Sequence, residues 1–151
     1  MRAINHALTG TLIGLAVGQP VIAVPAALAS HFVCDVIPHY GSSMSKLDEM
    51  KSLLFKRLLY VDALLCFGLV VMLALLQPVN WQLAAVCAFV AASPDFASLG
   101  QFRLANTHKT LKPNSYVKFA NGIQWFERPI GAVVEVIWAM VMIALIMPFI
   151  D

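Results

Sequence analysis

The chain has the length of a single domain and the composition of a membrane protein. Its 151 residues are 60% hydrophobic and only 12% charged, and the mean hydropathy of +0.80 lies well outside the range of soluble proteins. We therefore predict an all-α integral membrane bundle of about five helices, with residues 1–151 forming one transmembrane domain. The formal net charge is only +2, and we expect no nucleic-acid partner.

The first two apolar runs cover residues 7–17 and 21–37. Both are shorter than the ~20 residues that span a hydrocarbon core, so we predict a short helical hairpin. Gly10, Gly14 and Gly18 recur every fourth residue, which suits close packing of the first helix against a neighbour. A sequence that merely tolerates glycine would show the same spacing. No small-residue cleavage site follows a short apolar core, so we do not expect a removable signal peptide.

Two polar loops and three longer apolar runs follow. Residues 41–57 are polar, with a short amphipathic helix expected near their end, and residues 58–76 are long enough to cross a membrane. A fourth run extends from Trp81 to about Phe96, and Pro94 interrupts it. The second polar loop, 99–128, contains His108, which we interpret as a solvated residue. Pro129 is placed to begin a fifth helix over 130–150.

The three cysteines lie in apolar runs without Cys-x-x-Cys spacing. This argues against both a disulfide framework and a thiolate zinc site. We interpret Cys34, Cys66 and Cys87 as small buried hydrophobic residues.

Threading five crossings places the ionisable residues of the apolar helices at one membrane face. A charge within a membrane helix is costly unless it is paired, hydrated or bound to a metal, and it usually marks a functional site. No arginine or lysine lies inside these helices as a partner. The residues brought to this face are His6, His31, Asp35, His39, Asp62, Asp95, Glu127 and Glu135.

The basic residues predict the orientation. Arg2 and both polar loops lie on the same face as the acidic and histidine residues, whereas the opposite turns and the C-terminal tail contain no lysine or arginine. The positive-inside rule then places the N-terminus and the polar face in the cytoplasm and the C-terminus outside. The basic loops could also attract anionic lipid headgroups.

The residue types favour a metal centre. His31 and Asp35 share a helical face at an i, i+4 spacing, and Pro38 should end the helix so that His39 can turn toward the same site. Carboxylates and imidazoles without thiolates suit zinc, with manganese or iron as alternatives. We predict that His39 and Glu127 lie nearer the mouth of the site, where they orient the metal ligands or act as general acid or base. The predicted metal ligands are His6, His31, Asp35, Asp95, Glu135 and Asp62.

These motifs carry a resemblance to a known family. Asn5-His6-x-x-x-Gly, His31-x-x-x-Asp35-x-x-Pro38-His39, the Pro94-Asp95 pair and Glu135 resemble the small inner-membrane proteins described as membrane-bound metal-dependent hydrolases, some of them SOS-regulated. The resemblance implies a bacterial inner-membrane protein with a metal-centred hydrolase site. The ligand pattern is more remotely similar to that of zinc-dependent phospholipase C, which uses His-x-x-x-Asp and His-x-x-x-Glu pairs. This chain departs from it, because Gly131 stands four residues before Glu135.

Three functions are compatible with these patterns. The leading hypothesis is a metal-dependent hydrolase that acts on a lipid or another small amphiphilic phosphoester or ester at the cytoplasmic interface. The alternatives are a transport protein coupled to a cation or proton, and a non-catalytic adaptor with a structural metal site. Transport requires access from both faces, whereas the polar residues are expected at only one.

Overall fold

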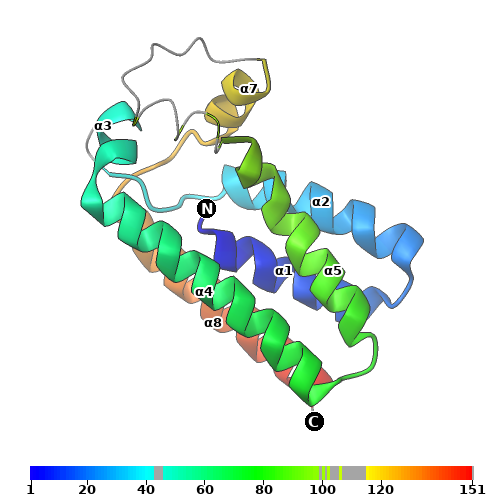
Figure 1. The fold of residues 1–151 in the computed structure, drawn as a ribbon. Helices are drawn as coiled ribbons and strands as arrows, with labels where there is room; N and C mark the ends of the chain where they lie inside the picture. The colour runs from blue at the N-terminus through cyan, green and yellow to red at the C-terminus, as the bar shows by residue number, and fades with distance from the viewer. Residues whose placement is uncertain (43–45, 99, 101, 103–105, 107–114, 151) are drawn as a thin grey trace.

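The described part of the chain is entirely helical in its regular structure (Figure 1). The structure is a computed structural model that describes all residues except 43–45, 99, 101, 103–105, 107–114 and 151. This confirms the all-α prediction. The elements are α1 (Ala3–Val17), α2 (Pro20–Val36), α3 (Lys46–Lys51), α4 (Leu53–Leu76), α5 (Trp81–Ala92), η1 (Ser93–Ser98), α7 (Ser115–Ile123), α8 (Gly131–Ile146) and η2 (Met147–Phe149).

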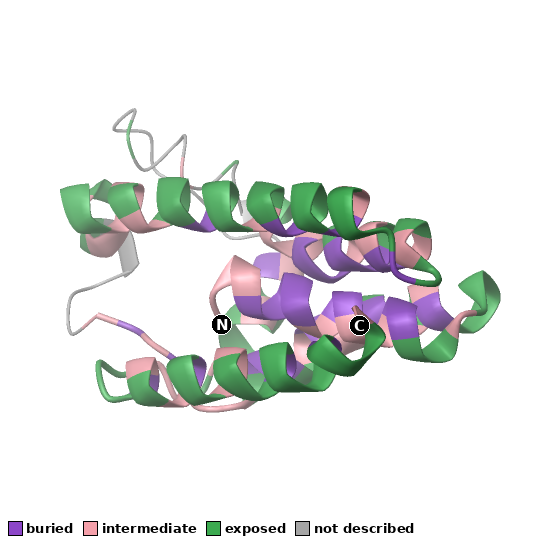
Figure 2. Ribbon diagram, turned by 90° about the horizontal axis from the view of Figure 1, so that it is seen from below, coloured by how far each residue is buried: buried purple, intermediate pink, exposed green. Residues whose placement is uncertain are grey.

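Helix α1 is the centre of the bundle. It packs against α2, α4, α5 and α8, and the buried residues gather in the middle of the bundle while the outer helices are largely exposed (Figure 2). The predicted hairpin is present: α1 ends at Gly18, which adopts φ 66° in the left-handed region and so reverses the chain into α2. The first helix was thus predicted correctly as a short one, and its many neighbours explain why it is buried.

Glycines bring α1 and α5 into backbone contact. A Cβ atom at Gly10 would overlap the carbonyl of Cys87, and one at Gly14 would overlap the backbone of Ala84. The predicted close packing of the first helix is therefore confirmed at these two positions, and α5 is the neighbour. The third glycine of the series, Gly18, serves the turn instead.

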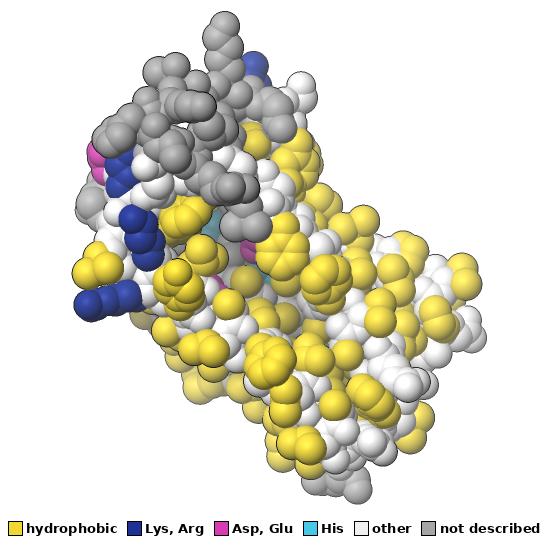
Figure 3. Space-filling view, in the orientation of Figure 1, with side chains coloured by type: hydrophobic (Ala, Val, Ile, Leu, Met, Phe, Trp, Pro, Cys, Tyr) yellow, Lys and Arg dark blue, Asp and Glu magenta, His cyan; other side chains and the backbone are white. Residues whose placement is uncertain are grey.

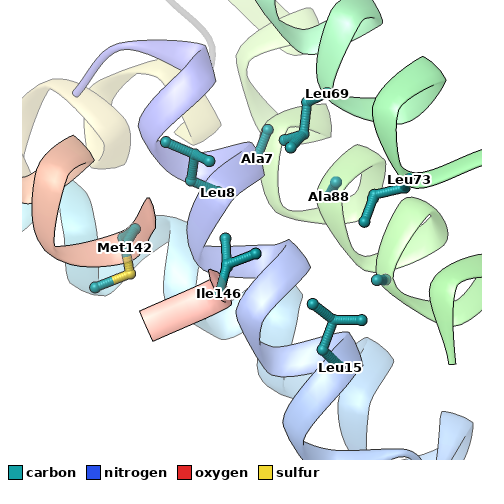
Figure 4. Close-up of a cluster of buried hydrophobic side chains, with 9 residues drawn as sticks. Ala7, Leu8, Leu15, Leu69, Leu73, Ala88, Met142 and Ile146 are labelled. Atoms are coloured by element: carbon teal, nitrogen blue, oxygen red, sulfur yellow. The ribbon is translucent and has the colours of Figure 1, made fainter. Parts of the chain in front are cut away.

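The apolar core lies in the half of the bundle away from the polar residues. Ala7 of α1 lies beside Leu69 of α4, and Ala88 of α5 lies near Leu73, whereas Leu8 lies on the side of α1 nearer to Met142 of α8 (Figure 4). Leu73 is completely buried. The described side chains of this cluster are all hydrophobic, so the cluster holds the helices together through apolar packing.

Two helices are long and apolar enough to cross a membrane: α4, with 24 residues, and Gly131–Phe149, with 19 residues. Only 17% of each hydrophobic window is buried, and side chains such as Leu64 and Leu75 are 70% and 78% exposed. Helices α1, α2 and α5 are shorter. The length and composition of two helices therefore support membrane crossings. The crossings by the other three helices of the predicted bundle stay a prediction.

One end of the bundle gathers the polar elements. The start of α1, the end of α2 and the starts of α4 and α8 meet there, beside α3 and α7 (Figure 1). The first polar loop contains a short helix, α3, but in its middle and not near its end, which already belongs to α4. Helix α7 in the second loop was not predicted. Helix α4 begins earlier than expected, at Leu53, because the Ser52 hydroxyl caps it by accepting a hydrogen bond from the Phe55 amide at 3.1 Å. His108 lies outside the described residues.

Candidate functional site

Two histidines and a carboxylate meet where α1 and α2 pack together. His31 and Asp35 share a face of α2, with 3.5 Å between His31 Nε2 and Asp35 Oδ2. His6 reaches the same carboxylate from α1, at 3.2 Å from Oδ1, and its ring stacks on that of His31 with centroids 4.1 Å apart. All three side chains are buried. The structure therefore brings together the three residues that the sequence placed at the start of α1 and the end of α2.

Asp95 joins this group from the end of α5. Pro94 converts the end of the apolar run into the 3-10 helix η1, and Asp95 Oδ1 then lies 3.9 Å from His31 Nε2. One ligand atom from each of His6, His31 and Asp95 lies within 4.8 Å of the others. Such a group of two imidazoles and a carboxylate matches the ligand types of a zinc site.

The hydrogen bond of His31 determines which of its ring nitrogens can bind a metal. His31 Nδ1 lies 2.8 Å from the carbonyl oxygen of Ala91. A carbonyl can only accept, so Nδ1 holds the proton and Nε2 presents its lone pair. For His6, Nε2 lies 3.2 Å from Asp35 Oδ1, whereas Nδ1 has no hydrogen-bond partner within the described residues, although the residue is fully buried. A buried nitrogen without a partner is costly, and a metal ligand is one role that would satisfy it.

Asp35 is the most contacted acid of this group. Its Oδ1 atom lies 2.6 Å from the amine nitrogen of Met1, and its Oδ2 atom accepts a hydrogen bond from Gln124 Nε2 at 3.1 Å. Sequence reasoning did not identify Gln124. Its signal was the spacing of Tyr116, Ala120 and Gln124, which recurs every fourth residue and places all three on the same side of the site.

Asp62 and Glu135 form a separate centre around Arg2. The Arg2 Nε atom donates to Asp62 Oδ2 at 2.8 Å, and the Arg2 backbone N–H donates to Glu135 Oε1 at 2.9 Å. The sequence analysis found no basic partner for these acids inside the helices, but Arg2 supplies one from just before α1. Asp62 Oδ1 has no hydrogen-bond partner among the described residues. A metal role for Asp62 and Glu135 stays a prediction, and the observed partner of both is Arg2.

His39 and Glu127 face each other from two extended segments. His39 N–H donates to the Phe126 carbonyl at 3.2 Å, and the Arg128 N–H donates to the His39 carbonyl at 3.3 Å. His39 Nε2 then lies 3.6 Å from Glu127 Oε1. Its Nδ1 atom lies 2.7 Å from the Ile37 carbonyl, so Nδ1 carries the proton and Nε2 faces the acid. The pair predicted from the sequence as acid or base is therefore assembled, while its catalytic role stays a prediction.

Gly131 explains the departure from the phospholipase C pattern. A Cβ atom at this position would overlap the backbone of His39, because α8 begins directly against that segment. No side chain fits there, so the chain has no place for a histidine four residues before Glu135. Gly41 is similarly constrained by Glu127, and the two glycines permit the close approach that pairs His39 with Glu127.

The surroundings of Asp95 change its acidity. Burial, with a smaller effect from nearby carboxylates, raises the pKa of the Asp95 carboxyl to about 7, although 37% of its side-chain surface remains accessible beside the cavities. Burial likewise raises the pKa of Tyr116, whose hydroxyl donates to the Pro94 carbonyl at 3.0 Å. A carboxyl with a raised pKa binds a cation in exchange for its proton.

Two cavities meet at these side chains. The smaller, of about 190 Å³, is lined by His31, Asp35 and Asp95. The larger, of about 560 Å³, extends between α4 and α5 and also reaches Asp95 and Glu127. On this face acidic and histidine side chains lie at the bottom of a hollow flanked by hydrophobic side chains (Figure 3). The candidate site is thus open to a ligand that has both a polar and an apolar part.

Comparisons with known proteins add no further assignment. The chain matches no protein-family model, no curated protein and no solved structure.

Proposed function

We propose that this protein is a membrane-embedded, metal-dependent hydrolase of an amphiphilic ester or phosphoester. The observation that carries the proposal is the group of His6, His31 and Asp95, whose ligand atoms lie within 4.8 Å of one another beside a cavity. Asp35 lies 3.2 Å from His6 and 3.5 Å from His31. A catalytic metal needs about three protein ligands and an open position. The three side chains, together with the cavity lined by His31 and Asp95, support such a site.

The residues fit a divalent metal, with zinc as the first choice. His6, His31 and Asp95 would hold it, and Asp35 would either join them or orient the two imidazoles. When bound, a divalent ion supplies Lewis acidity toward an acyl or phosphoryl oxygen and increases the acidity of water. Gln124 holds Asp35 through a hydrogen bond, so the carboxylate keeps its position between the histidines.

His39 and Glu127 would move the proton. The Ile37 carbonyl fixes the His39 tautomer, so that Nε2 is the basic nitrogen. This nitrogen can accept a proton from a water molecule and later donate it to the leaving group. The Glu127 carboxylate, 3.6 Å away, would stabilise the imidazolium that forms between these steps. Glu127 lines both cavities, which places the pair at the junction that a substrate would reach.

The surface supports a membrane placement of the proposed enzyme. Helix α4 and the segment Gly131–Phe149, formed by α8 and η2, are apolar segments of sufficient length, and the site lies at the end of the bundle where the described basic side chains also gather (Figure 3). The positive-inside rule places this end in the cytoplasm. The resemblance stated above suggests the bacterial inner membrane. The substrate would then be reached from the cytoplasmic leaflet.

The apolar half of the bundle favours an enzyme over a transport protein. The core beyond the site is formed by side chains such as Leu15, Leu73 and Ile146. In the part of the chain that the structure describes, this core has no ionisable side chain that could carry a cation or proton across the membrane, and the fully buried Thr11 of α1 offers only a hydroxyl. A transporter would need such groups on both sides of its binding site.

Metal content and turnover test the proposal together. The protein, purified without chelator, is assayed for bound metal and for hydrolysis of phospholipids and carboxylic esters with and without added zinc or manganese. We expect His31→Ala and Asp35→Ala to lose both the metal and the activity. His39→Gln should keep the metal and lose activity, and Asp48→Asn, on the exposed surface of α3, should keep both. Unchanged metal content in His31→Ala and Asp35→Ala would refute the metal site, and bound metal without turnover of any ester would favour the structural alternative.

A further inference from the structure

We propose that the cavity between α4 and α5 binds one acyl chain of a bilayer lipid, so that the substrate is a lipid ester held by its tail. This inference rests on the proposed function, because it uses the same site. It adds the substrate class and the direction of access. The volume of about 560 Å³ lies within the ~300–1,000 Å³ typical of ligand pockets.

One wall of the cavity is an apolar stripe of α4. Leu59, Ala63, Phe67 and Val70 all line it, and their spacing of three and four residues places them on one face of the helix. Asp62 lines the polar end of the same wall. From Asp62 to Val70 the helix rises by roughly 12 Å, so the wall could follow an extended hydrocarbon chain for that distance.

The opposite wall is made of alanines, which leave room for a ligand. Ala3 and Ala7 of α1, and Ala88 and Ala92 of α5, line the cavity at i, i+4 spacings. At Gly10 the backbones of α1 and α5 are in contact, and Ala7 and Ala88 also belong to the apolar core. Larger side chains at the four alanine positions would reduce the space that the cavity occupies.

The cavity ends where the apolar core begins. Past Val70 along α4, Leu73 is completely buried and belongs to the same apolar cluster as Leu15 and Ala84. The space between α1, α4 and α5 is therefore filled at that level. The end of a bound chain would stop here, and the depth of the cavity would favour long chains up to this limit.

The polar end of the cavity contains the proposed catalytic groups. Asp95, His39 and Glu127 line it, so an ester bond at the head of a bound chain would lie next to them. At the side, Phe67 and Phe89 line the cavity while 68% and 61% of their surfaces are exposed. Because α4 is apolar on its outer face as well, its surroundings are expected to be lipid, and a chain can enter sideways between the two helices.

A bulky side chain on α4 provides the variant for a test. Ala63 lines the cavity and is exposed, so Ala63→Trp adds volume there without disturbing the buried core. Leu64 is the matched control, because it is the next residue, is 70% exposed and does not line the cavity. Leu64→Trp therefore adds the same side chain to the same helix on another face. Size-exclusion chromatography and circular dichroism should show that both variants remain folded.

Binding is measured separately from hydrolysis. The probe is a phosphatidylcholine with a diazirine in its palmitoyl chain, presented in a bile-salt detergent that has no acyl chain of its own. We expect saturable labelling of the α4 and α5 residues that line the cavity, suppressed by excess unlabelled phosphatidylcholine. Labelling should be lost in Ala63→Trp and retained in Leu64→Trp. Labelling that does not saturate, or that is equal in both variants, would overturn the proposal.

Turnover gives a second, independent result. For the metal-loaded protein, a palmitoyl ester should be hydrolysed with a lower KM than a butyryl ester, and Ala63→Trp should remove that preference while Leu64→Trp keeps it. Loss of contact with only two methylene groups already weakens binding roughly tenfold. Equal turnover of both esters by the unaltered protein would refute the acyl-chain site and leave the hydrolase intact. Saturable labelling without metal-dependent turnover would instead refute the hydrolase and support the acyl-chain site.

Discussion

The two acidic centres at the polar end contain similar residues but have different partners. Asp62 and Glu135 share Arg2, whose side chain and backbone N–H contact one acid each. Asp35 and Asp95 lie instead beside two stacked imidazoles, and the Met1 amine pairs with Asp35 at 2.6 Å. The first centre resolves its charge within the protein. In the second, Asp95 lies 3.9 Å from the His31 imidazole, and we expect a cation from outside to balance it. The difference separates a structural ion pair from a candidate metal site.

The largest effect is expected from removing the charge of Asp35. Asp35→Asn keeps the shape of the side chain but weakens its contacts with His6, His31 and the Met1 amine. We expect metal affinity to fall by about 100-fold, the upper range for groups that ligate a metal or orient its ligands. Isothermal titration with zinc measures this change. An unaltered affinity would mean that the imidazole centre is not the metal site.

The next largest effect is expected at Gly131. Gly131→Ala forces a methyl group against the His39 backbone, and overpacking of this kind reduces the free energy of unfolding by about 1–3 kcal/mol. The shift should also separate His39 from Glu127 and reduce turnover. Gly68→Ala is the control, because nothing lies within 4 Å of a Cβ atom at Gly68. Denaturant titration of both variants compares them, and equal losses would contradict the close packing described.

Removing Arg2 should affect stability without affecting the metal. Arg2→Met leaves Asp62 without its ion-pair partner, while the backbone N–H of residue 2 can still donate to Glu135. Since the Arg2 side chain is 23% exposed, we expect a loss of about 1–2 kcal/mol, less than for a fully buried pair. Adding Asp62→Asn should restore part of this loss in a double-mutant cycle. If Arg2→Met also abolished metal binding, the two acidic centres would have to be treated as one.

The smallest change is expected from Glu127→Gln. Glu127 is 27% exposed in its side chain, so its replacement should leave stability and metal content nearly unaltered. If it stabilises the His39 imidazolium, turnover should fall by about tenfold. Parallel measurements of metal content and kcat separate the two roles. If Glu127→Gln instead lost its bound metal, Glu127 would belong to the metal site.

Local spacing predicted the parts of the site that depend on one helix or one proline. The i, i+4 spacing of His31 and Asp35 keeps the two side chains close together, whatever the helix packs against. Pro38 comes just after the end of that helix, as expected for a residue that stops it. Pro94 similarly indicated the change from α5 to η1 at Asp95. These features are local, so the sequence alone determines them.

The parts that depend on tertiary contacts were not predictable in the same way. In the sequence, Arg2 indicated only the orientation of the chain in the membrane. The central position of α1 is what brings it to Asp62 and Glu135. Helix α7, with Gln124 just after it, lies in a polar loop that gave a weak apolar pattern. The pairing of His39 with Glu127 joins segments 88 residues apart in sequence, and no local spacing could indicate it.

The backbone contact at Gly10 has a consequence for how the metal ligands are aligned. Because no side chain separates α1 from α5 there, the spacing between the helix that carries His6 and the helix that leads to Asp95 is set by direct contact of their main chains. The position of the His6 imidazole relative to α5 therefore depends on a glycine one helical turn further along α1. A single methyl group added at Gly10 would misalign the centre without touching any of its ligands.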